Sequence, residues 1–272
     1  MGVREYCLRR PNNLTTYRTI GDGGPVFVFL HGFPDFWESL IPLSKRLNPT
    51  GTNVFFDLRG YNGTPPLAAP EAYRILDVAR DFSDLASNLG ASDMVFVGHD
   101  WGGAVAWWLW MMAAPKFRAF VSIAAPHPSA LFAGMADDGQ WQASAYARTI
   151  AARDRHEVFE MDRLAYWCND ETHRTRLVAA LERSSSFAMA SYYNQNYPRA
   201  RDMCLEGLPS GPAPFLLVYG AADPYILAGT FERSAQFGGA QVSIAVVSGG
   251  HFVHVTETDM VSETINRWLA DV

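Results

Sequence analysis

Residues 94–114 of the chain read MVFVGHDWGGAVAWWLWMMAA, and this stretch decides the fold class. Its first four residues form an apolar run without alternation, which is typical of a strand buried on both faces of a parallel sheet. The apolar run from Gly102 to Ala114 is shorter than the ~20 residues that cross a bilayer, so it predicts a buried helix. In between, Gly98-His99-Asp100-Trp101-Gly102 predicts a sharp turn that lifts Asp100 above the sheet as a nucleophile. An aspartate there could also be only a helix N-cap.

Strand and helix patterns alternate on both sides of this turn. Short apolar runs end at glycine, aspartate or proline, and stretches of helical length and spacing lie between them. The alternation predicts an α/β class with a doubly wound, mostly parallel sheet. We expect strands at residues 26–30, 53–56, 94–97, 120–123, 215–220 and 242–247, a leading hairpin at 6–8 and 14–17, and helices at 37–47, 73–89, 101–114 and 260–270.

The pattern changes between residues 128 and 208. No run in this segment has the character of a buried strand, and its Ala, Arg, Glu and aromatic residues fall into helical stretches. We therefore expect an α/β core formed by residues 1–127 and 209–272, with a helical insertion at 128–208. The expected helices of the insertion are 141–152, 156–167, 172–181 and 187–193.

Two further residues stand where a catalytic triad needs them. Asp223 and His251 each follow one of the last two expected strands. The chain order of nucleophile, acid and histidine is that of the α/β-hydrolase fold. Two alternatives remain open, because Asp223 could only cap a turn and His254 lies close enough to be mistaken for His251.

Backbone donors for an oxyanion are expected beside Asp100. His31-Gly32-Phe33-Pro34 follows the strand expected at 26–30. The carboxyl ends of parallel strands meet at one edge of a sheet, which is where ligands bind. The backbone N–H groups of Phe33 and Trp101 are therefore the expected oxyanion hole.

Composition narrows the classes of partner. The 272 residues include 22 Lys and Arg against 28 Asp and Glu, a net charge of −6, so nucleic acid and anionic membranes have no electrostatic support. Cys7, Cys168 and Cys204 are too few and too scattered for a disulfide framework or a zinc cluster, which favours the cytoplasm. We also expect no signal peptide, no cofactor and no metal, and a monomer or homodimer.

Together these motifs resemble the α/β-hydrolase superfamily, and within it the soluble epoxide hydrolase branch, which is related to the haloalkane dehalogenases. The resemblance implies an α/β-hydrolase fold with a mostly parallel eight-stranded sheet, a helical lid at 128–208, and catalysis by Asp100, Asp223 and His251. It covers almost the whole core. The matching segments are His31-Gly32-Phe33-Pro34, Asp57-Leu58-Arg59-Gly60-Tyr61, Val97-Gly98-His99-Asp100-Trp101-Gly102-Gly103, Ala125-Pro126-His127-Pro128 and Gly250-His251-Phe252.

An aspartate in place of a nucleophilic serine predicts which bond is broken. Attack by serine on a saturated carbon would leave an ether that the enzyme cannot cleave. Attack by the carboxylate of Asp100 gives an ester, which water activated by His251 and Asp223 can hydrolyse. We therefore predict cleavage of a carbon–oxygen or carbon–halogen bond at an alkyl carbon.

An epoxide also needs a proton donor opposite the nucleophile, and phenols are suitable donors. The resemblance implies one early and one late lid tyrosine, which correspond to Tyr146 and Tyr193, with Tyr192 as the alternative late donor. Residues 148–155 lack the Pro-Gly that many relatives carry after the first lid tyrosine. Further contacts to an apolar epoxide are expected from Trp37, His99, Trp101 and Tyr192.

Other functions remain open. A haloalkane dehalogenase would use the same triad, although Phe33 stands where many dehalogenases carry Asn. The arginines that fluoroacetate dehalogenases place after the nucleophile are replaced by Trp101-Gly102-Gly103-Ala104. A protein that binds a ligand without turnover would be expected to have a broken triad. A serine-type esterase is disfavoured because position 100 is Asp.

Overall fold

The computed structural model of the chain describes residues 2–10 and 13–272. Within them, one eight-stranded sheet runs in the order β1-β2-β4-β3-β5-β6-β7-β8. β1, β2 and β4 pair antiparallel, and all other neighbours pair parallel. The strands are β1 (Arg4–Arg10), β2 (Asn13–Ile20), β3 (Val26–Leu30), β4 (Thr52–Phe56), β5 (Met94–His99), β6 (Phe117–Ile123), β7 (Phe215–Gly220) and β8 (Val242–Val247).

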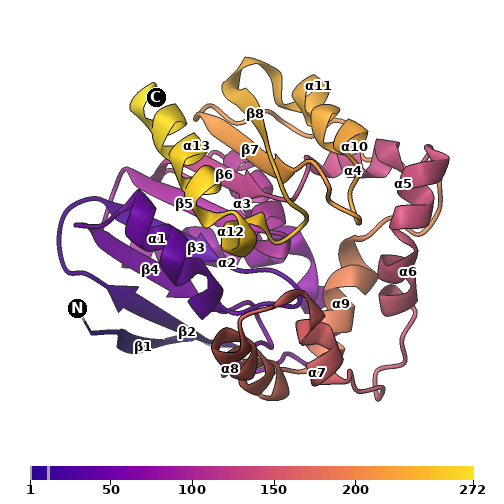
Figure 1. Cartoon of the computed structure of the whole chain (residues 1–272), viewed down its shortest axis with the longest axis horizontal. Helices are drawn as coiled ribbons and strands as arrows, with labels where there is room; N and C mark the ends of the chain where they lie inside the picture. Colours follow the sequence, from indigo (N-terminus) through magenta and orange to yellow (C-terminus); the bar gives the residue numbers. More distant parts are fainter. Residues whose placement is uncertain (1, 11–12) are drawn as a thin grey trace.

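Helices cover both faces of this sheet (Figure 1). On one face α1 packs against α13, and on the other α2 packs against α3, which also contacts β5 and β6. The helices of the core are η1 (Trp37–Leu40), α1 (Ile41–Leu47), η2 (Pro70–Tyr73), α2 (Ile75–Asn88), α3 (Trp101–Met111), α10 (Ala228–Glu232), α11 (Ser234–Gly238), η4 (Gly239–Gln241), α12 (Val253–Thr256) and α13 (Thr258–Ala270).

The segment between β6 and β7 is helical, as predicted. In Figure 1, α6 to α9 lie together beside the sheet, and α4 and α5 connect them to the region of α10. α4 packs on α10 and α11, so its contacts place it with the core, and the lid boundary at residue 128 stays a prediction. The elements are α4 (Pro128–Gly134), α5 (Asp138–Ala143), α6 (Ala145–Ala151), α7 (Met161–Leu164), η3 (Ala165–Trp167), α8 (Glu171–Glu182) and α9 (Ser186–Asn196).

Two of the expected helices are interrupted. The helix expected at 141–152 divides at Ser144, a buried residue whose hydroxyl is hydrogen-bonded by Gln140 and Tyr197. The helix expected at 156–167 begins only at Met161, because the N–H of Phe159 donates to another segment of the lid instead of to a preceding turn. Periodicity alone does not reveal these side-chain contacts.

The edges of the sheet differ from its centre. β8 is largely apolar in sequence, but most of its residues are partly or fully exposed because the strand forms the sheet edge. The expected hairpin is β1 paired with β2, although residues 11 and 12 between these strands lie outside the described part of the chain. Across the described residues, no helix is both long and apolar enough to cross a membrane.

Candidate active site

Asp100 lies at the junction of β5 and α3, in a sharp turn. Its φ of +51° is a conformation that residues other than glycine rarely adopt. A side chain on Gly98 would collide with the backbone of Gly102, and one on Gly102 would collide with the carbonyl of Leu30 in β3. The two glycines therefore allow the close approach of strand and helix that holds this turn.

The carboxylate of Asp100 does not cap the helix that it precedes. Its Oδ1 atom accepts a hydrogen bond of 2.7 Å from the backbone N–H of Phe33, and Oδ2 lies 3.5 Å from Nε2 of His251. The N-cap alternative is therefore wrong, and the carboxylate is held between a backbone donor and an imidazole. The role of the Trp101 N–H as a second oxyanion donor stays a prediction.

His251 and Asp223 form a close pair. Nδ1 of His251 lies 2.7 Å from Oδ2 of Asp223, and the other carboxylate oxygen accepts the backbone N–H groups of Tyr225 and Ile226 at 2.8 and 3.1 Å. Asp223 is therefore fixed by its own turn and orients the imidazole. The neighbouring His254 lies against Asp35 instead, at 2.9 Å, so it does not take the place of His251.

The charge of His251 depends on both carboxylates. Burial lowers the pKa of this imidazole, but Asp223 and Asp100, each through its charge and one hydrogen bond, outweigh burial and raise the pKa to about 10. With both carboxylates ionised, His251 is therefore an imidazolium at neutral pH. A neutral group in place of the Asp100 carboxylate would remove part of this stabilisation.

Tyr146 on α6 and Tyr193 on α9 lie across from Asp100. Both line the same two cavities as Asp100, and their ring centroids are 6.0 Å apart. Burial is the main cause that raises the pKa of each phenol well above its usual value. A neighbouring phenol (Tyr197 for Tyr146, and Tyr146 for Tyr193) and the charge of Asp100 raise it further. Both side chains are therefore protonated at neutral pH and able to donate a hydrogen bond into the cavities.

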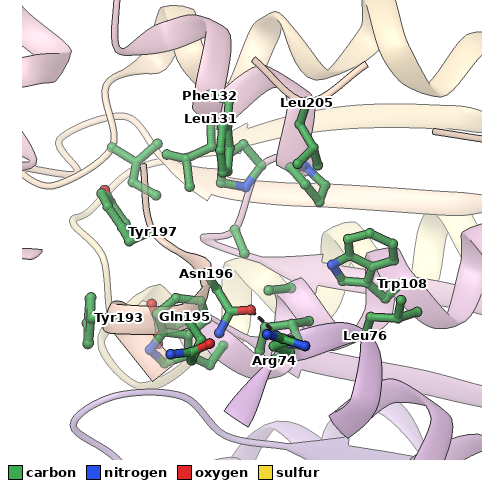
Figure 2. Close-up of a pocket in the computed structure, with 18 of the residues that line it drawn as sticks. Arg74, Leu76, Trp108, Leu131, Phe132, Tyr193, Gln195, Asn196, Tyr197 and Leu205 are labelled. Atoms are coloured by element: carbon green, nitrogen blue, oxygen red, sulfur yellow. Dashed lines mark hydrogen bonds between the residues drawn. The ribbon is translucent and has the colours of Figure 1, made fainter. Parts of the chain in front are cut away.

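Two cavities, of about 250 and 230 Å³, meet at Asp100, Tyr146 and Tyr193. Cavity 1, the larger, extends along α3 and α4, and Figure 2 shows its apolar walls together with the polar side chains at one end. Cavity 2 extends toward His251. The walls also include Trp108, Leu131 and Leu205 in cavity 1, and Phe33, Ile150 and Tyr225 in cavity 2.

Three of the expected substrate contacts do not line either cavity, and their role in substrate binding stays a prediction that the cavities do not support. Trp37 packs against Phe55, with the Arg18 guanidinium over its ring. His99 points into the core behind the triad. Tyr192 is fully buried among aromatic rings and lines neither cavity, whereas Tyr193 lines both; which of them is the proton donor stays a prediction. Trp101, the fourth expected contact, does line cavity 1.

Several lining residues were not predicted. Ala104 and Trp108 follow Trp101 at the i+3 and i+7 positions of α3, so all three lie on one face of the helix and line cavity 1. This spacing was visible in the sequence. Tyr225 and Ile226, which follow Asp223, gave no comparable signal; each contributes to one of the cavities.

One buried group has the composition of a metal site. Donor atoms of Asp35, His99 and His254 lie within 4.8 Å of one another, and all three side chains are fully buried. Nε2 of His254 is hydrogen-bonded to Asp35, and Nε2 of His99 donates to the carbonyl of His251. These contacts describe a hydrogen-bonded network, and the expectation of no metal stays a prediction.

The fold and the site together define a hydrolase architecture with an aspartate at the nucleophile position. The family model described as the alpha/beta hydrolase fold matches residues 25–258, and the chain belongs to this family. The fold class predicted from the sequence is thereby confirmed.

Named relatives agree with the predicted resemblance. Epoxide hydrolase 4 of Mus musculus is 36% identical over 107 residues, which cover 39% of this chain and 30% of that protein. An epoxide hydrolase of Caballeronia sordidicola is 26% identical over 263 residues, covering 89% of this chain and 76% of that protein. The chain thus matches about 30% of the length of the mouse relative.

Solved structures share the fold. An epoxide hydrolase from Bacillus megaterium, in complex with an inhibitor, superposes with a TM-score of 0.82 at 20% identity, covering 97% of this chain and 100% of that chain. An epoxide hydrolase from metagenomes of hot environments gives a TM-score of 0.81 at 22% identity, with 99% of each chain covered. At these identities the likeness concerns the fold.

Proposed function

We propose that the protein is an epoxide hydrolase that forms a covalent ester on Asp100. The observation that carries the proposal is the position of the Asp100 carboxylate. It lies at the meeting point of two apolar cavities, with His251 on one side and the phenols of Tyr146 and Tyr193 in the same cavity walls. Nucleophile, base and proton donors are therefore all within reach of one substrate.

The first step opens the epoxide. An oxygen of Asp100 attacks one epoxide carbon, and the carbon–oxygen bond breaks with its electron pair on the oxygen. That oxygen takes a proton from Tyr146 or Tyr193, which becomes a phenolate. Asp100 needs no base for this attack, because a carboxylate is already ionised near neutral pH.

The second step hydrolyses the ester. His251, held by Asp223, takes a proton from water, and hydroxide adds to the carbonyl carbon of Asp100. The backbone N–H of Phe33, which contacts Asp100 Oδ1 at 2.7 Å, stabilises the negative oxygen that develops. Collapse expels the diol oxygen, which takes the proton from His251. The proton on the regenerated Asp100 carboxyl passes to His251, which restores the carboxylate and the imidazolium of the free protein.

The ester also explains how His251 can act as a base. In the free protein, Asp100 helps to hold the pKa of His251 at about 10. Esterification removes the charge of Asp100, so the pKa of His251 falls. The imidazolium can then pass its proton to the phenolate left by the first step, because both groups line cavity 2, and this leaves a neutral imidazole. The base is thus activated only after the intermediate has formed.

The experiment that tests the proposal uses His251→Gln with styrene oxide. Alkylation of Asp100 does not need the base, so an adduct with the mass of the substrate should accumulate and be visible by intact mass spectrometry. A single turnover of the wild type in ¹⁸O-water should label the protein and not the first diol. Label in the first diol would rule out the ester route, and an Asp100→Ala variant serves as the inactive control.

A second candidate is haloalkane dehalogenation. Nε1 of Trp101 is buried beside cavity 1 and has no hydrogen-bond partner among the described residues, so it could donate to a departing halide. Release of bromide from a bromoalkane, with no action on styrene oxide, would favour this function. Ligand binding without turnover is the remaining alternative. The triad geometry gives it no support, and thermal stabilisation by an epoxide that is never converted would favour it.

The proposed substrate is a small apolar epoxide, and water is the second reactant. Apolar side chains dominate both cavities, which suits a hydrophobic substituent more than a charged one. The cytoplasmic location, the absence of a cofactor and the monomeric or dimeric state stay predictions from the sequence.

A further inference from the structure

A buried network contacts His251, and its side chains line neither substrate cavity. Its members are Asp35, His99 and His254, and the side chains of all three are fully buried. The proposed mechanism uses none of them. We propose that this network positions the His251 loop for hydrolysis of the ester, an inference that rests on the proposed function.

The contacts define the direction of each hydrogen bond. Nε2 of His99 lies 3.1 Å from the carbonyl oxygen of His251, and a carbonyl only accepts, so this nitrogen carries the proton. Nε2 of His254 lies 2.9 Å from Oδ2 of Asp35 and donates to it. The other oxygen of Asp35 accepts the Phe36 N–H at 2.8 Å and the hydroxyl of Ser39.

Each member of the network lies close in sequence to a different residue of the proposed active site. Asp35 is two residues after Phe33, which supplies the N–H to Asp100. His99 immediately precedes Asp100, and His254 follows His251 by three residues. The rings of His99 and His254 are in contact, with centroids 3.9 Å apart. The hydrogen bond between His254 and Asp35 and the ring contact between His254 and His99 therefore join the three segments that carry the oxyanion donor, the nucleophile and the base.

The network should affect the two steps unequally. Attack by Asp100 on the epoxide does not require an oriented base, whereas ester hydrolysis requires His251 to face both water and the ester carbonyl. His99 holds the main chain of His251, and small displacements of a catalytic group are costly. Loss of the His99 donor should thus slow hydrolysis and leave alkylation unchanged, which is the behaviour of a positioning residue.

His99→Leu and His99→Gln test this assignment. Leucine removes the donor, whereas a glutamine amide can supply an N–H to the His251 carbonyl. In His99→Leu we expect kcat and KM to fall together by about 10-fold, because kcat/KM reports the alkylation step alone. Intact mass spectrometry during turnover should show more alkylated protein than in the wild type. His99→Gln should restore kcat to within about threefold of the wild type.

His127→Gln is the matched control. His127 is another buried histidine, but it caps α4 and contacts Ser129 and Trp107 instead of the triad. It should leave the ratio of alkylation to hydrolysis unchanged. Should His99→Leu fail to fold, Asp35→Asn is expected to give the same joint fall of kcat and KM.

Three outcomes would overturn the assignment. One is a fall of kcat in His99→Leu without a fall of KM or a rise of adduct, which would indicate only a loss of folded protein. Another is one equivalent of metal in the purified wild type that is lost in His254→Gln. The third is a kcat of His99→Gln that is no higher than that of His99→Leu. In each case the wild type still forms an ester, whereas failure of the proposed function would leave no adduct in His251→Gln.

Discussion

Replacement of Asp100 by asparagine should lower the pKa of His251. Asparagine keeps the shape of the side chain but removes its charge, as the ester intermediate does. Two of the four contributions that raise the pKa of His251 come from Asp100, namely a hydrogen bond and its charge. The variant therefore reproduces, in a stable protein, the electrostatic state in which His251 is proposed to act as a base.

The size of the effect follows from the distance between the two groups. Nε2 of His251 lies 3.5 Å from Oδ2 of Asp100. At an effective dielectric constant of about 20, two unit charges at this distance interact by roughly 5 kcal/mol, which corresponds to an upper limit of about 3.5 pKa units. We expect the pKa to fall from about 10 in the wild type to roughly 7–8 in Asp100→Asn.

Nuclear magnetic resonance of the imidazole ring measures both values. The ring carbon signals of ¹³C-labelled histidine are followed from acid to alkaline pH in the wild type and the variant, and His251→Gln identifies the signal of His251. Mass spectrometry verifies that the new amide has not been hydrolysed back to aspartate. A pKa that differs by less than half a unit between the two proteins would refute the idea that esterification activates the base.

Three further outcomes are expected. Tyr146→Phe and Tyr193→Phe should each slow adduct formation in stopped-flow single turnovers by about 10- to 100-fold, and the double variant should be slower still, whereas ester hydrolysis should change less. Because the pKa of His251 is higher in the folded than in the unfolded chain, protonation of His251 stabilises the fold fully below about pH 6.5, and this stabilisation is lost as the pH rises to about 10. The unfolding free energy of the wild type, measured by urea titration, should therefore fall across this window by a few kcal/mol more than that of Asp100→Asn. Gly102→Ala should destabilise the protein by about 2 kcal/mol or more in the same titration, because its Cβ would meet the Leu30 carbonyl; an unchanged midpoint would contradict the crowding argument.

The proximity of Asp100, Asp223 and His251 could be predicted because the chain constraints that bring them together are local. Glycines on both sides of Asp100 are demanded by close backbone approach, and Asp223 and His251 follow strands whose ends share one edge of the sheet. Each of these features can be recognised in a short segment of the sequence. The structure accordingly brings together all three side chains that the sequence had singled out.

The direction of individual side chains was harder to predict. Successive residues of a strand point to opposite faces, so His99 points away from the cavity into which Asp100 points, and this reason was available from the sequence. Tyr192 and Tyr193 are consecutive residues of α9, so their side chains point in different directions from the helix. Only the packing of Tyr192 on Tyr61 and Tyr73 shows that Tyr193 is the phenol in the cavity. Contacts between distant segments, such as Trp37 with Phe55, leave no trace in periodicity.

Asp100, Tyr146 and Tyr193 line both cavities, and this arrangement has a consequence for the stereochemistry of the proposed reaction. An unsymmetrical epoxide bound between Asp100 and the lid phenols has one substituent in each chamber, and turning the molecule end for end exchanges which carbon faces the carboxylate. Under the proposed function, the relative sizes of the chambers would select the regioisomer and the enantiomer. Substitutions at Leu131 in one chamber or Ile150 in the other would alter that selection while leaving the reacting groups untouched.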